Sequence, residues 1–273
     1  MKPLNVNFDS PQVMAIVNVT PDSFFEGSRS SEREDLERRI AEVVEQGASI
    51  IDIGGYSSRP GADDVTPEEE WRRVELGLSV AREVAPSTTI SVDTFRGEVA
   101  RKAVERFGAV IINDISAGEI DPSIIDVAAE YKLPYIAMHM RGMPQSMQQM
   151  TQYRDIVREV VEYFTQRVEF LKSRGVESII LDPGFGFAKS LEQNYTLMRG
   201  LHQLCELGYP VLSGVSRKSM IYKLLDTTPQ DALAGTLVLG WESLRQGAKI
   251  LRVHDVREAV QTLKIYNACF HKV

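Results

Sequence analysis

Short apolar runs and longer amphipathic runs alternate along the whole chain. The short runs are rich in Ile, Val and Leu, which is typical of strands buried on both faces, whereas the longer runs repeat apolar residues at helical spacing. Strands that alternate with helices in this way form a parallel sheet. We expect eight strands, at residues 13–18, 49–54, 89–93, 110–113, 134–139, 178–182, 210–214 and 249–253.

Capping residues mark where the intervening helices begin. Ser31 and Glu34 have the spacing of a capping box ahead of the first helix. A capping residue followed by proline at the first helical position predicts three further starts, at Thr66-Pro67, Asp121-Pro122 and Thr228-Pro229.

The number of β/α units selects the fold. Eight units in one chain fit a (β/α)8 TIM barrel with eight parallel strands better than an open doubly wound sheet, which usually has fewer strands and a glycine-rich first turn. The 273 residues suit one barrel, since such domains run to roughly 250 residues. No Ser/Gly-rich linker divides the chain, so we expect residues 1–273 to form a single domain, with 1–12 as a lead-in across the bottom.

Composition narrows the class of protein. A net charge of −7 argues against nucleic acid or an anionic membrane as the main partner. No window approaches the roughly 20 apolar residues of a membrane span, and the first residues lack an apolar signal segment, so we expect a cytoplasmic protein. Cys205 and Cys269 lie far apart without a metal-binding spacing, and we expect both to be structural.

Polar and ionisable residues follow the predicted strands. The carboxyl ends of all barrel strands meet on one face, where the active sites of such barrels lie. The residues concerned are Asn18, Asp52, Asp93, Asn113, His139, Asp182, the run Ser216-Arg217-Lys218-Ser219, Arg252 and His254. The loop that begins at Asp182, Asp-Pro-Gly-Phe-Gly-Phe, combines an acid, exposed backbone and flat rings.

Several of these residues also have a structural interpretation. Asp93 has the position of a cap for a helix that begins near Arg96, and Asn113 that of a turn residue. His139 fits a buried structural role and a functional one equally. Lys218, at the start of a helix, opposes the helix dipole, so we expect an anionic or electron-rich group to compensate its charge.

Charge separates the strand-end residues into two sets. The acceptor-rich set, Asp93, Asn113 and Asp182, suits a flat heterocycle that presents N–H donors, and Lys218 suits a carbonyl oxygen of its ring. A second, donor-rich set suits phosphate oxygens and consists of Asn18, Arg252 and His254. Asn18 and Asp52 are both available to a hard cation such as Mg2+.

The chain resembles the dihydropteroate synthase family along nearly its whole length. The matching segments begin at Asn18 (Asn-Val-Thr-Pro-Asp-Ser-Phe), Asp52 (Asp-Ile-Gly-Gly-Tyr-Ser-Ser-Arg-Pro-Gly), Ser91 (Ser-Val-Asp-Thr), Asn113 (Asn-Asp-Ile-Ser), Met138 (Met-His-Met-Arg-Gly), Asp182 (Asp-Pro-Gly-Phe-Gly-Phe), Ser216 (Ser-Arg-Lys-Ser) and Arg252 (Arg-Val-His-Asp-Val). Any one of these segments is weak alone, and their combination in order is specific.

The resemblance implies a transferase that condenses 7,8-dihydropterin-6-ylmethyl diphosphate with 4-aminobenzoate, with Mg2+ assistance, in folate biosynthesis. It implies that catalysis rests on Asp93, Asp182, Lys218, Arg252 and His254. The implied pterin site comprises Asp93, Asn113, Ile115, Met138, Asp182, Lys218 and Arg252. The implied diphosphate site comprises Asn18, Arg252 and His254, with Asn18 also the metal ligand.

The resemblance further implies a pocket for aminobenzoate, which is where sulfonamide drugs bind in this family. Its residues and lids would be Phe24, Ser58, Arg59, Pro60, Phe187 and Ser219. The family also implies a homodimer, formed through the last helices. One departure stands out, because Tyr56 occupies a position where the family commonly has Glu.

Two other functions remain open at this point. A methyltetrahydrofolate-dependent methyltransferase would share the barrel and the pterin site, yet it would not need the run Ser216-Arg217-Lys218-Ser219 or the anion site of Arg252 and His254. A catalytically silent pterin-binding paralogue should have lost the residues for diphosphate or the lids, and all of them are present here.

Overall fold

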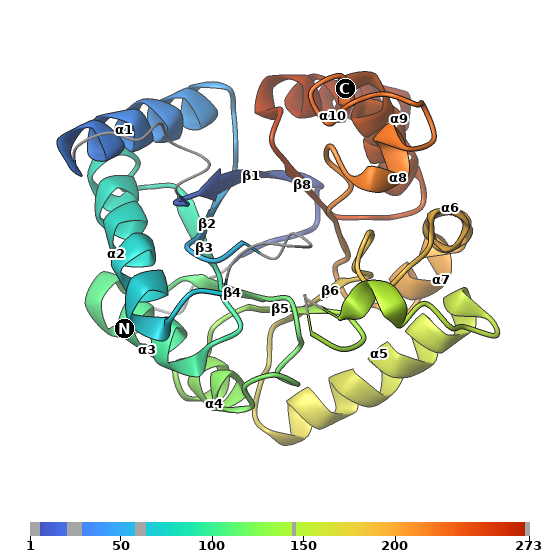
Figure 1. The fold of residues 1–273 in the computed structure, drawn as a ribbon, viewed down its shortest axis with the longest axis horizontal. Coiled ribbons are helices and arrows are strands. Elements are labelled where there is room, and N and C mark those ends of the chain that lie inside the picture. Colours follow the sequence, from blue (N-terminus) through green and yellow to red (C-terminus); the bar gives the residue numbers. More distant parts are fainter. Residues whose placement is uncertain (1–5, 21–28, 58–63, 144–145, 271–273) are drawn as a thin grey trace.

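Parallel strands surround the centre of the molecule, and helices form a ring outside them (Figure 1). The computed structural model describes residues 6–20, 29–57, 64–143 and 146–270. The strands are β1 (Gln12–Asn18), β2 (Ile50–Gly54), β3 (Thr89–Asp93), β4 (Ile111–Asp114), β5 (Tyr135–Met138), β6 (Ile179–Asp182), β7 (Leu212–Ser213) and β8 (Ile250–Val253).

The strand order is β6-β5-β4-β3-β2-β1-β8-β7, and every pair is parallel. Between β6 and β7 a single bridge, Leu181 to Val211, closes the circle. The predicted (β/α)8 TIM barrel is therefore confirmed, with one weak seam.

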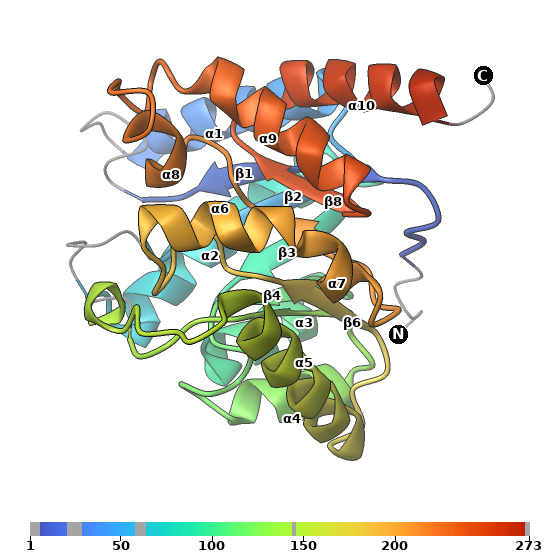
Figure 2. The ribbon, with the colours of Figure 1, turned by 90° about the vertical axis from the view of Figure 1, so that its right-hand side faces the viewer.

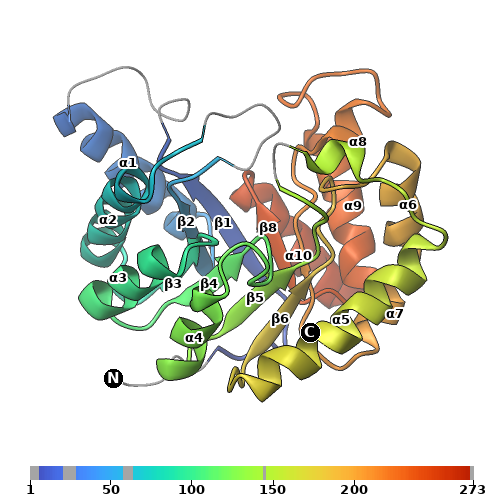
Figure 3. The ribbon, with the colours of Figure 1, turned by 60° about the horizontal axis from the view of Figure 1, so that its bottom comes forward.

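The helices cover the outside of the strands, as the side view shows (Figure 2). They are α1 (Arg29–Glu45), α2 (Pro67–Val84), α3 (Gly97–Phe107), α4 (Ser123–Glu130), α5 (Ile156–Ser173), α6 (Leu191–Arg199), α7 (Leu201–Cys205), α8 (Ser219–Tyr222), α9 (Leu233–Arg245) and α10 (Val256–Phe270), with a 3-10 turn at η2 (Met147–Gln149). The helices α1 to α3 lie on one side of the barrel and α6 to α9 on the opposite side (Figure 3).

The capping predictions had mixed outcomes. Thr66 caps α2, and its Oγ1 accepts a hydrogen bond from the Glu69 N–H at 3.3 Å. Ser31 is wrong as a cap, because α1 already begins at Arg29. Thr228 is also wrong as a helix start, since its Oγ1 accepts from the Asp231 N–H in a separate turn and α9 begins only at Leu233. A hydroxyl can satisfy a short turn as readily as a helix end.

The barrel is filled with side chains on the amino-terminal side of the strand ends. Seven strands contribute one buried apolar residue each to an inner cluster, and β3 contributes the buried Ser91 beside them. The cluster consists of Met14, Ile50, Ile111, Ile136, Ile180, Leu212 and Ile250. Because this layer is solid, a ligand reaches the barrel interior only from the carboxyl ends of the strands.

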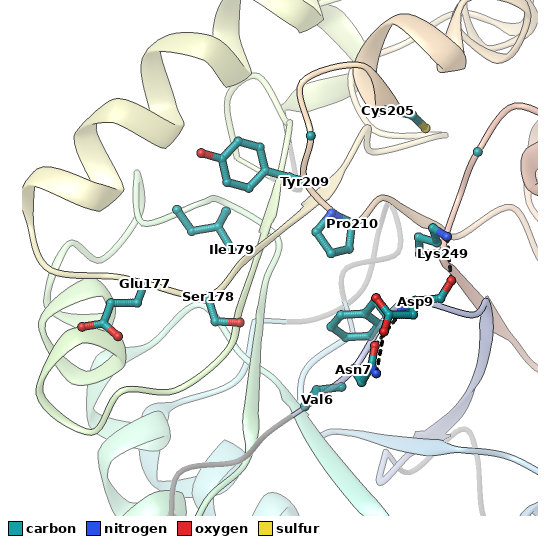
Figure 4. A pocket seen from close by; sticks show the side chains of 13 residues that line it. Val6, Asn7, Asp9, Glu177, Ser178, Ile179, Cys205, Tyr209, Pro210 and Lys249 are labelled. Carbon is teal, nitrogen blue, oxygen red and sulfur yellow. Dashed lines mark hydrogen bonds between the residues drawn. The ribbon is translucent and has the colours of Figure 1, made fainter.

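A cavity of about 670 Å³ lies at the opposite, amino-terminal end (Figure 4). Residues 6–9 of the lead-in line it, and the Asp9 carbonyl accepts a hydrogen bond from Lys249 Nζ at 3.0 Å. Ser178 and Pro210, which precede β6 and β7, line the same space. None of the predicted site residues lines this cavity, and those that the structure describes lie instead at the carboxyl ends of the strands.

Candidate active site

The carboxyl ends of the first four strands align in one row. Asn18 of β1 pairs in register with Gly54 of β2, Gly54 with Asp93 of β3, and Asp93 with Asn113 of β4. A Cβ placed on Gly54 would lie 3.5 Å from Asn18 Oδ1 and 3.6 Å from Asp93 Oδ2. The glycine therefore leaves room for the amide and the carboxylate to approach the same space.

Arg252, on β8 next to β1, reaches into the same part of the mouth. Its Nε donates to Asp52 Oδ2 and its Nη2 to Asp93 Oδ2, both at 2.6 Å. Asn113 Nδ2 donates to the same Asp52 oxygen at 2.9 Å. The acceptor-rich and donor-rich sets that the sequence suggested are thus interlocked rather than separate.

Burial and charge act in opposite directions within this cluster. Burial raises the pKa of Asp93 to about 7, although the guanidinium of Arg252 favours the charged carboxylate. Burial also disfavours the charge of Arg252, but Asp52 and Asp93 outweigh it and raise the pKa of Arg252. Asp52 is fully buried, and its Oδ1 has no hydrogen-bond partner among the described residues. The cluster therefore keeps one acceptor oxygen that no described residue satisfies.

Asp182 and Lys218 meet on the other side of the mouth. A Cβ on Gly214 would lie 3.7 Å from Lys218 Nζ and 4.0 Å from Asp182 Oδ2, so both groups face the same glycine. Burial raises the pKa of Asp182, against the charge of Lys218. Burial lowers the pKa of Lys218 to about 8, against the charge of Asp182. The pair therefore offers one acceptor and one cation side by side.

The loop after β6 surrounds this pair. Asp182 Oδ1 accepts from the Gly184 N–H at 2.7 Å, and Lys218 Nζ donates to the Phe185 carbonyl. Lys218 Nζ also lies 4.7 Å from the centre of the Phe187 ring. The charge of Lys218, which the sequence left without a partner, is thus compensated by Asp182, a carbonyl and an aromatic face.

An apolar wall stands beside these charged groups. Ile115, Met138 and Phe187 belong to one cluster, separate from the main core. The other members are Tyr56, Val65, Phe95, Ile120, Met140, Met147 and Ala188. Polar acceptors next to an apolar wall suit a flat heterocycle, whose edge needs hydrogen bonds and whose faces need contact.

His254 is held by Ser216 from the loop after β7. The Ser216 hydroxyl accepts a hydrogen bond from the backbone N–H of His254 at 3.1 Å. The same hydroxyl lies 3.0 Å from the ring nitrogen Nδ1 of His254. Arg217, by contrast, turns to Asp255, with Nη2 2.6 Å from Oδ1. Ser219 is the half-buried first residue of α8, directly after Lys218.

The donor set around Asn18 fits Mg2+ only if a substrate supplies further oxygens. Within the described part of the chain no three His, Cys, Asp or Glu residues cluster closely enough to hold a metal. Asn18 nevertheless presents an amide oxygen next to Asp93. Mg2+ typically binds through one or two protein oxygens together with substrate phosphates. The amide oxygen of Asn18 is compatible with such a site.

Part of the predicted aminobenzoate pocket lies outside the described residues, namely Phe24, Ser58, Arg59 and Pro60. Tyr56, at the edge of that loop, is 9% exposed and packs edge-to-face on Phe95, with ring centres 5.2 Å apart. The guanidinium of Arg96 lies 5.5 Å from the Tyr56 ring. An aromatic residue therefore fills the position where the family commonly has Glu.

The structure also decides three alternatives. Thr94, and not Asp93, accepts the hydrogen bond from the Arg96 N–H, at 3.1 Å, so the capping interpretation of Asp93 is wrong. Asn113 lies within β4 and is no turn residue. His139 is buried and its Nδ1 contacts Lys189 Nζ, which favours the structural interpretation.

Comparison with known proteins agrees with this geometry. The family model described as pterin binding enzyme matches residues 14–254. A dihydropteroate synthase from Synechocystis is 44% identical over 259 residues, which cover 94% of this chain and 89% of the relative. The chain belongs to the dihydropteroate synthase family of pterin-binding enzymes. Its activity class is therefore that of a transferase that makes dihydropteroate.

Solved dihydropteroate synthases have the same fold. The enzyme from Xanthomonas albilineans with 4-aminobenzoic acid matches with a TM-score of 0.89 and 38% identity, covering 98% of this chain and 96% of that one. The same enzyme in complex with 7,8-dihydropteroate matches with a TM-score of 0.86 and 37% identity, covering 98% and 97%. The barrel fold is thus shared with structures of dihydropteroate synthases.

Sequence reasoning underrated three residues. Asp52 was assigned only a metal-binding option, whereas it holds Arg252 and Asn113. Ser216 and Lys189 were assigned no role, although one fixes His254 and the other lies behind the Asp182 loop. The position of Asp52 at the end of β2 was the available signal, while nothing in the sequence marks Lys189 as buried.

Proposed function

We propose that this chain condenses 7,8-dihydropterin-6-ylmethyl diphosphate with 4-aminobenzoate and releases diphosphate. The observation that carries the proposal is the arrangement of charged groups at the mouth. Asp182 and Lys218 both face Gly214. Arg252 donates hydrogen bonds to Asp52 and to Asp93. A relative supports the same reaction, since the Xanthomonas albilineans dihydropteroate synthase has been solved with 4-aminobenzoic acid and with 7,8-dihydropteroate.

In this proposal the pterin ring lies between the acids and the apolar wall. Asp182 accepts N–H bonds from the pyrimidine edge, and Lys218 donates to the ring carbonyl. Asp93 and Asn113 hold the other edge. Ile115 and Met138 contact a ring face, and Arg252 stacks over the pterin.

The diphosphate lies on the donor side of the mouth. Arg252 and His254 supply N–H donors, and Ser216 keeps the imidazole of His254 in place. Asn18 would hold Mg2+ through its amide oxygen, and the metal would neutralise part of the diphosphate charge. Because Arg252 is already paired with two carboxylates, it is oriented without help from the substrate.

The chemistry asks the chain mainly for positioning and electrostatics. The bond from the methylene carbon to the diphosphate oxygen breaks and the electron pair leaves with the oxygen, while a bond forms from the aniline nitrogen to that carbon. Asp93 and Asp182 stabilise positive charge on the pterin, and Arg252 and His254 stabilise the departing diphosphate. The aniline nitrogen gives up its proton after it has attacked, so the site needs no strong base.

The aminobenzoate pocket extends this site toward the surface. Phe187 and Ser219 border it in the proposal, and Phe24, Ser58, Arg59 and Pro60 complete it as lids. Sulfonamide binding there stays a prediction of the same assignment.

Purified protein mixed with the pterin diphosphate, 4-aminobenzoate and Mg2+ tests the reaction directly. We expect diphosphate and dihydropteroate to appear in equal amounts, and omission of 4-aminobenzoate should prevent dihydropteroate formation. Diphosphate release without dihydropteroate would contradict the proposal. Pterin binding without turnover would favour the silent paralogue, and methyl transfer from methyltetrahydrofolate would favour the methyltransferase.

A homodimer through the last helices completes the proposal. Three large apolar residues on these helices are strongly exposed. They are Val238 on α9, at 66%, and Ile265 and Phe270 on α10, at 59% and 55%. Trp241 and Tyr266 pack edge-to-face between these helices, with ring centres 5.8 Å apart. Sedimentation of the protein and of a Val238→Glu, Ile265→Glu variant tests this, and an unchanged mass would argue against these helices as the interface.

The proposal treats residues 1–273 as one catalytic domain in the cytoplasm. None of the helices in the described ranges is long and apolar enough to cross a membrane. Fractionation of cells that make the protein, with the assay above as the readout, tests the location.

A further inference from the structure

Lys189 carries a buried charge for which the reaction has no use. It follows the Asp-Pro-Gly-Phe-Gly-Phe loop and is only 4% exposed. Its Nζ contacts neutral acceptors rather than a carboxylate, and these are the Gly184 carbonyl at 2.9 Å, the Phe187 carbonyl at 3.0 Å and His139 Nδ1 at 3.1 Å. A buried ammonium without a carboxylate partner is costly, so an apolar side chain of similar size would be cheaper for the fold alone.

The acceptors belong to the loop that shapes the site. Gly184 and Gly186 have φ values of 67° and 85°, and Ala188, which has a side chain, has a φ of 50°. Left-handed backbone at these alternate positions turns carbonyl groups toward Lys189, and the conformation at Ala188 is strained. The ammonium compensates this by satisfying two of the carbonyls at once.

A second cation, Lys218, binds the same loop from the side of the mouth. Lys218 Nζ donates to the Phe185 carbonyl, while Lys189 holds the carbonyls of Gly184 and Phe187 from behind. Asn194 adds a further tie, since its Oδ1 accepts from the Gly186 N–H at 2.7 Å. Consecutive peptide groups of the loop are thus fixed from both sides.

Lys189 also strengthens the weakest part of the barrel. The loop leaves β6 next to the seam at which only Leu181 and Val211 bridge to β7. On its other side β6 pairs with β5, which lies beside it in Figure 3. His139 directly follows β5, so the bond to its Nδ1 ties the loop to the well-paired side of the barrel.

The two protonation states bear on this arrangement differently, because neutral His139 suits it at neutral pH whereas Lys189 has its full set of donors below about pH 7. Burial, and next the charge of Lys189, lowers the pKa of His139 well below its usual range, so the ring is neutral and Nδ1 can accept. Burial lowers the pKa of Lys189 to about 7, against the charge of Asp182, while the charges of Lys218 and Arg141 lower it further. The ammonium form alone has three N–H donors, one for each of its three nearest acceptors.

We propose that Lys189 is a positioning residue for substrate binding, which holds the loop so that Asp182 and Phe187 face the pterin and aminobenzoate sites. The inference rests on the proposed function, because it assigns substrates to these two side chains. Lys189 itself touches neither substrate, and its effect reaches them through the loop carbonyls of Gly184 and Phe187.

Replacement of the ammonium tests this role. Lys189→Met keeps most of the length of the side chain and removes the donors, and we expect KM for both substrates to rise roughly ten-fold. We expect kcat to change little, because bound substrates hold the loop in their turn. Lys189→Gln, which keeps two N–H donors without a charge, should give intermediate KM values. Lys223→Met, on the exposed end of α8, is the matched control and should behave as the wild type.

Several results would overturn the inference. Unchanged KM values in folded Lys189→Met would do so, as would a loss confined to kcat. Failure of both Lys189 variants to fold, by circular dichroism, would make Lys189 a residue of the fold and not of the site. Calorimetric titration with the pterin substrate keeps the inference separate from the proposed function, since weaker binding by Lys189→Met is measurable even if the wild type shows no turnover.

Discussion

Asp52 and Arg252 lie 200 positions apart in the sequence and meet at 2.6 Å, carboxylate oxygen to guanidinium Nε. Asp52 is fully buried, and it fixes the guanidinium from below while Asp93 fixes it from the side. A cation that is held on two sides keeps its direction at little further entropic cost when an anion binds. This pair connects the buried base of the candidate site to the guanidinium for which we propose contact with the diphosphate.

The first prediction concerns Asp52, the buried acid below the guanidinium of Arg252. Asp52→Asn keeps the shape of the side chain and removes its charge, so Arg252 loses its strongest fixed partner. We expect the affinity for the pterin diphosphate to fall roughly ten-fold or more, as for other charge-assisted hydrogen bonds. Calorimetric titration measures it. Asp126→Asn, the same change in an exposed ion pair on α4, should leave the affinity unaltered.

Arg252 itself should discriminate between two ligands. Arg252→Lys keeps a cation and loses the two-sided geometry of the guanidinium. We expect binding of the pterin diphosphate to weaken by roughly ten-fold more than binding of the same pterin without diphosphate. Parallel titrations with the two ligands provide the comparison. Equal losses for both would remove Arg252 from the diphosphate site.

Asp182 should decide whether the pterin binds at all. Asp182→Ala removes the acceptor that faces Lys218 and also the partner of the Gly184 N–H. We expect the loss of measurable pterin binding, because a buried polar site that lacks its acceptor rejects the ligand by several orders of magnitude. Asp182→Asn, which retains one oxygen, should bind more weakly than the wild type yet better than Asp182→Ala. Near-normal affinity of either variant would contradict the placement of the ring.

The pKa of Asp93 predicts a pH dependence of pterin binding. Because burial raises that pKa to about 7, the carboxylate is lost as the pH falls through neutrality. We expect pterin affinity to fall several-fold between about pH 8 and about pH 6, since a protonated carboxyl is a poorer acceptor. The affinity of Asp93→Asn should be weak throughout and should lack this slope. A slope that persists in the variant would assign the titration to another group.

The raised pKa of Asp93 makes the stability of the ligand-free fold change with pH in the opposite direction to the pterin affinity. A carboxyl group whose pKa is higher in the folded than in the unfolded chain favours folding at low pH, and this contribution is lost as the pH rises through about 7. The charge of Asp93 that serves the ligand therefore disfavours the ligand-free fold.

The barrel and the location of the site were predictable from the sequence. Eight alternating units imply a closed barrel, and the closure brings Asn18 and Asp182 to one face whatever their separation in the chain. Ends of elements were less certain. The strand expected at 210–214 is only Leu212–Ser213, because its pairing at the seam is confined to a single bridge.

Contacts between side chains could not be predicted in the same way. The pairing of Arg252 with Asp52 depends on the direction of two inward side chains at different heights, which spacing does not encode. Lys189 stands in the sequence Ala-Lys-Ser, which looks like an ordinary exposed turn, and its burial follows from the folding of the loop over it. Thr228 shows the converse, because a pattern typical of a helix start can be used by a turn.

The inner cluster that runs from Met14 to Ile250 closes one end of the barrel, so ligands enter and leave at the carboxyl ends of the strands. In the proposed function the pterin diphosphate lies deeper than 4-aminobenzoate, so it must bind first. The two then leave together as dihydropteroate, by the same opening.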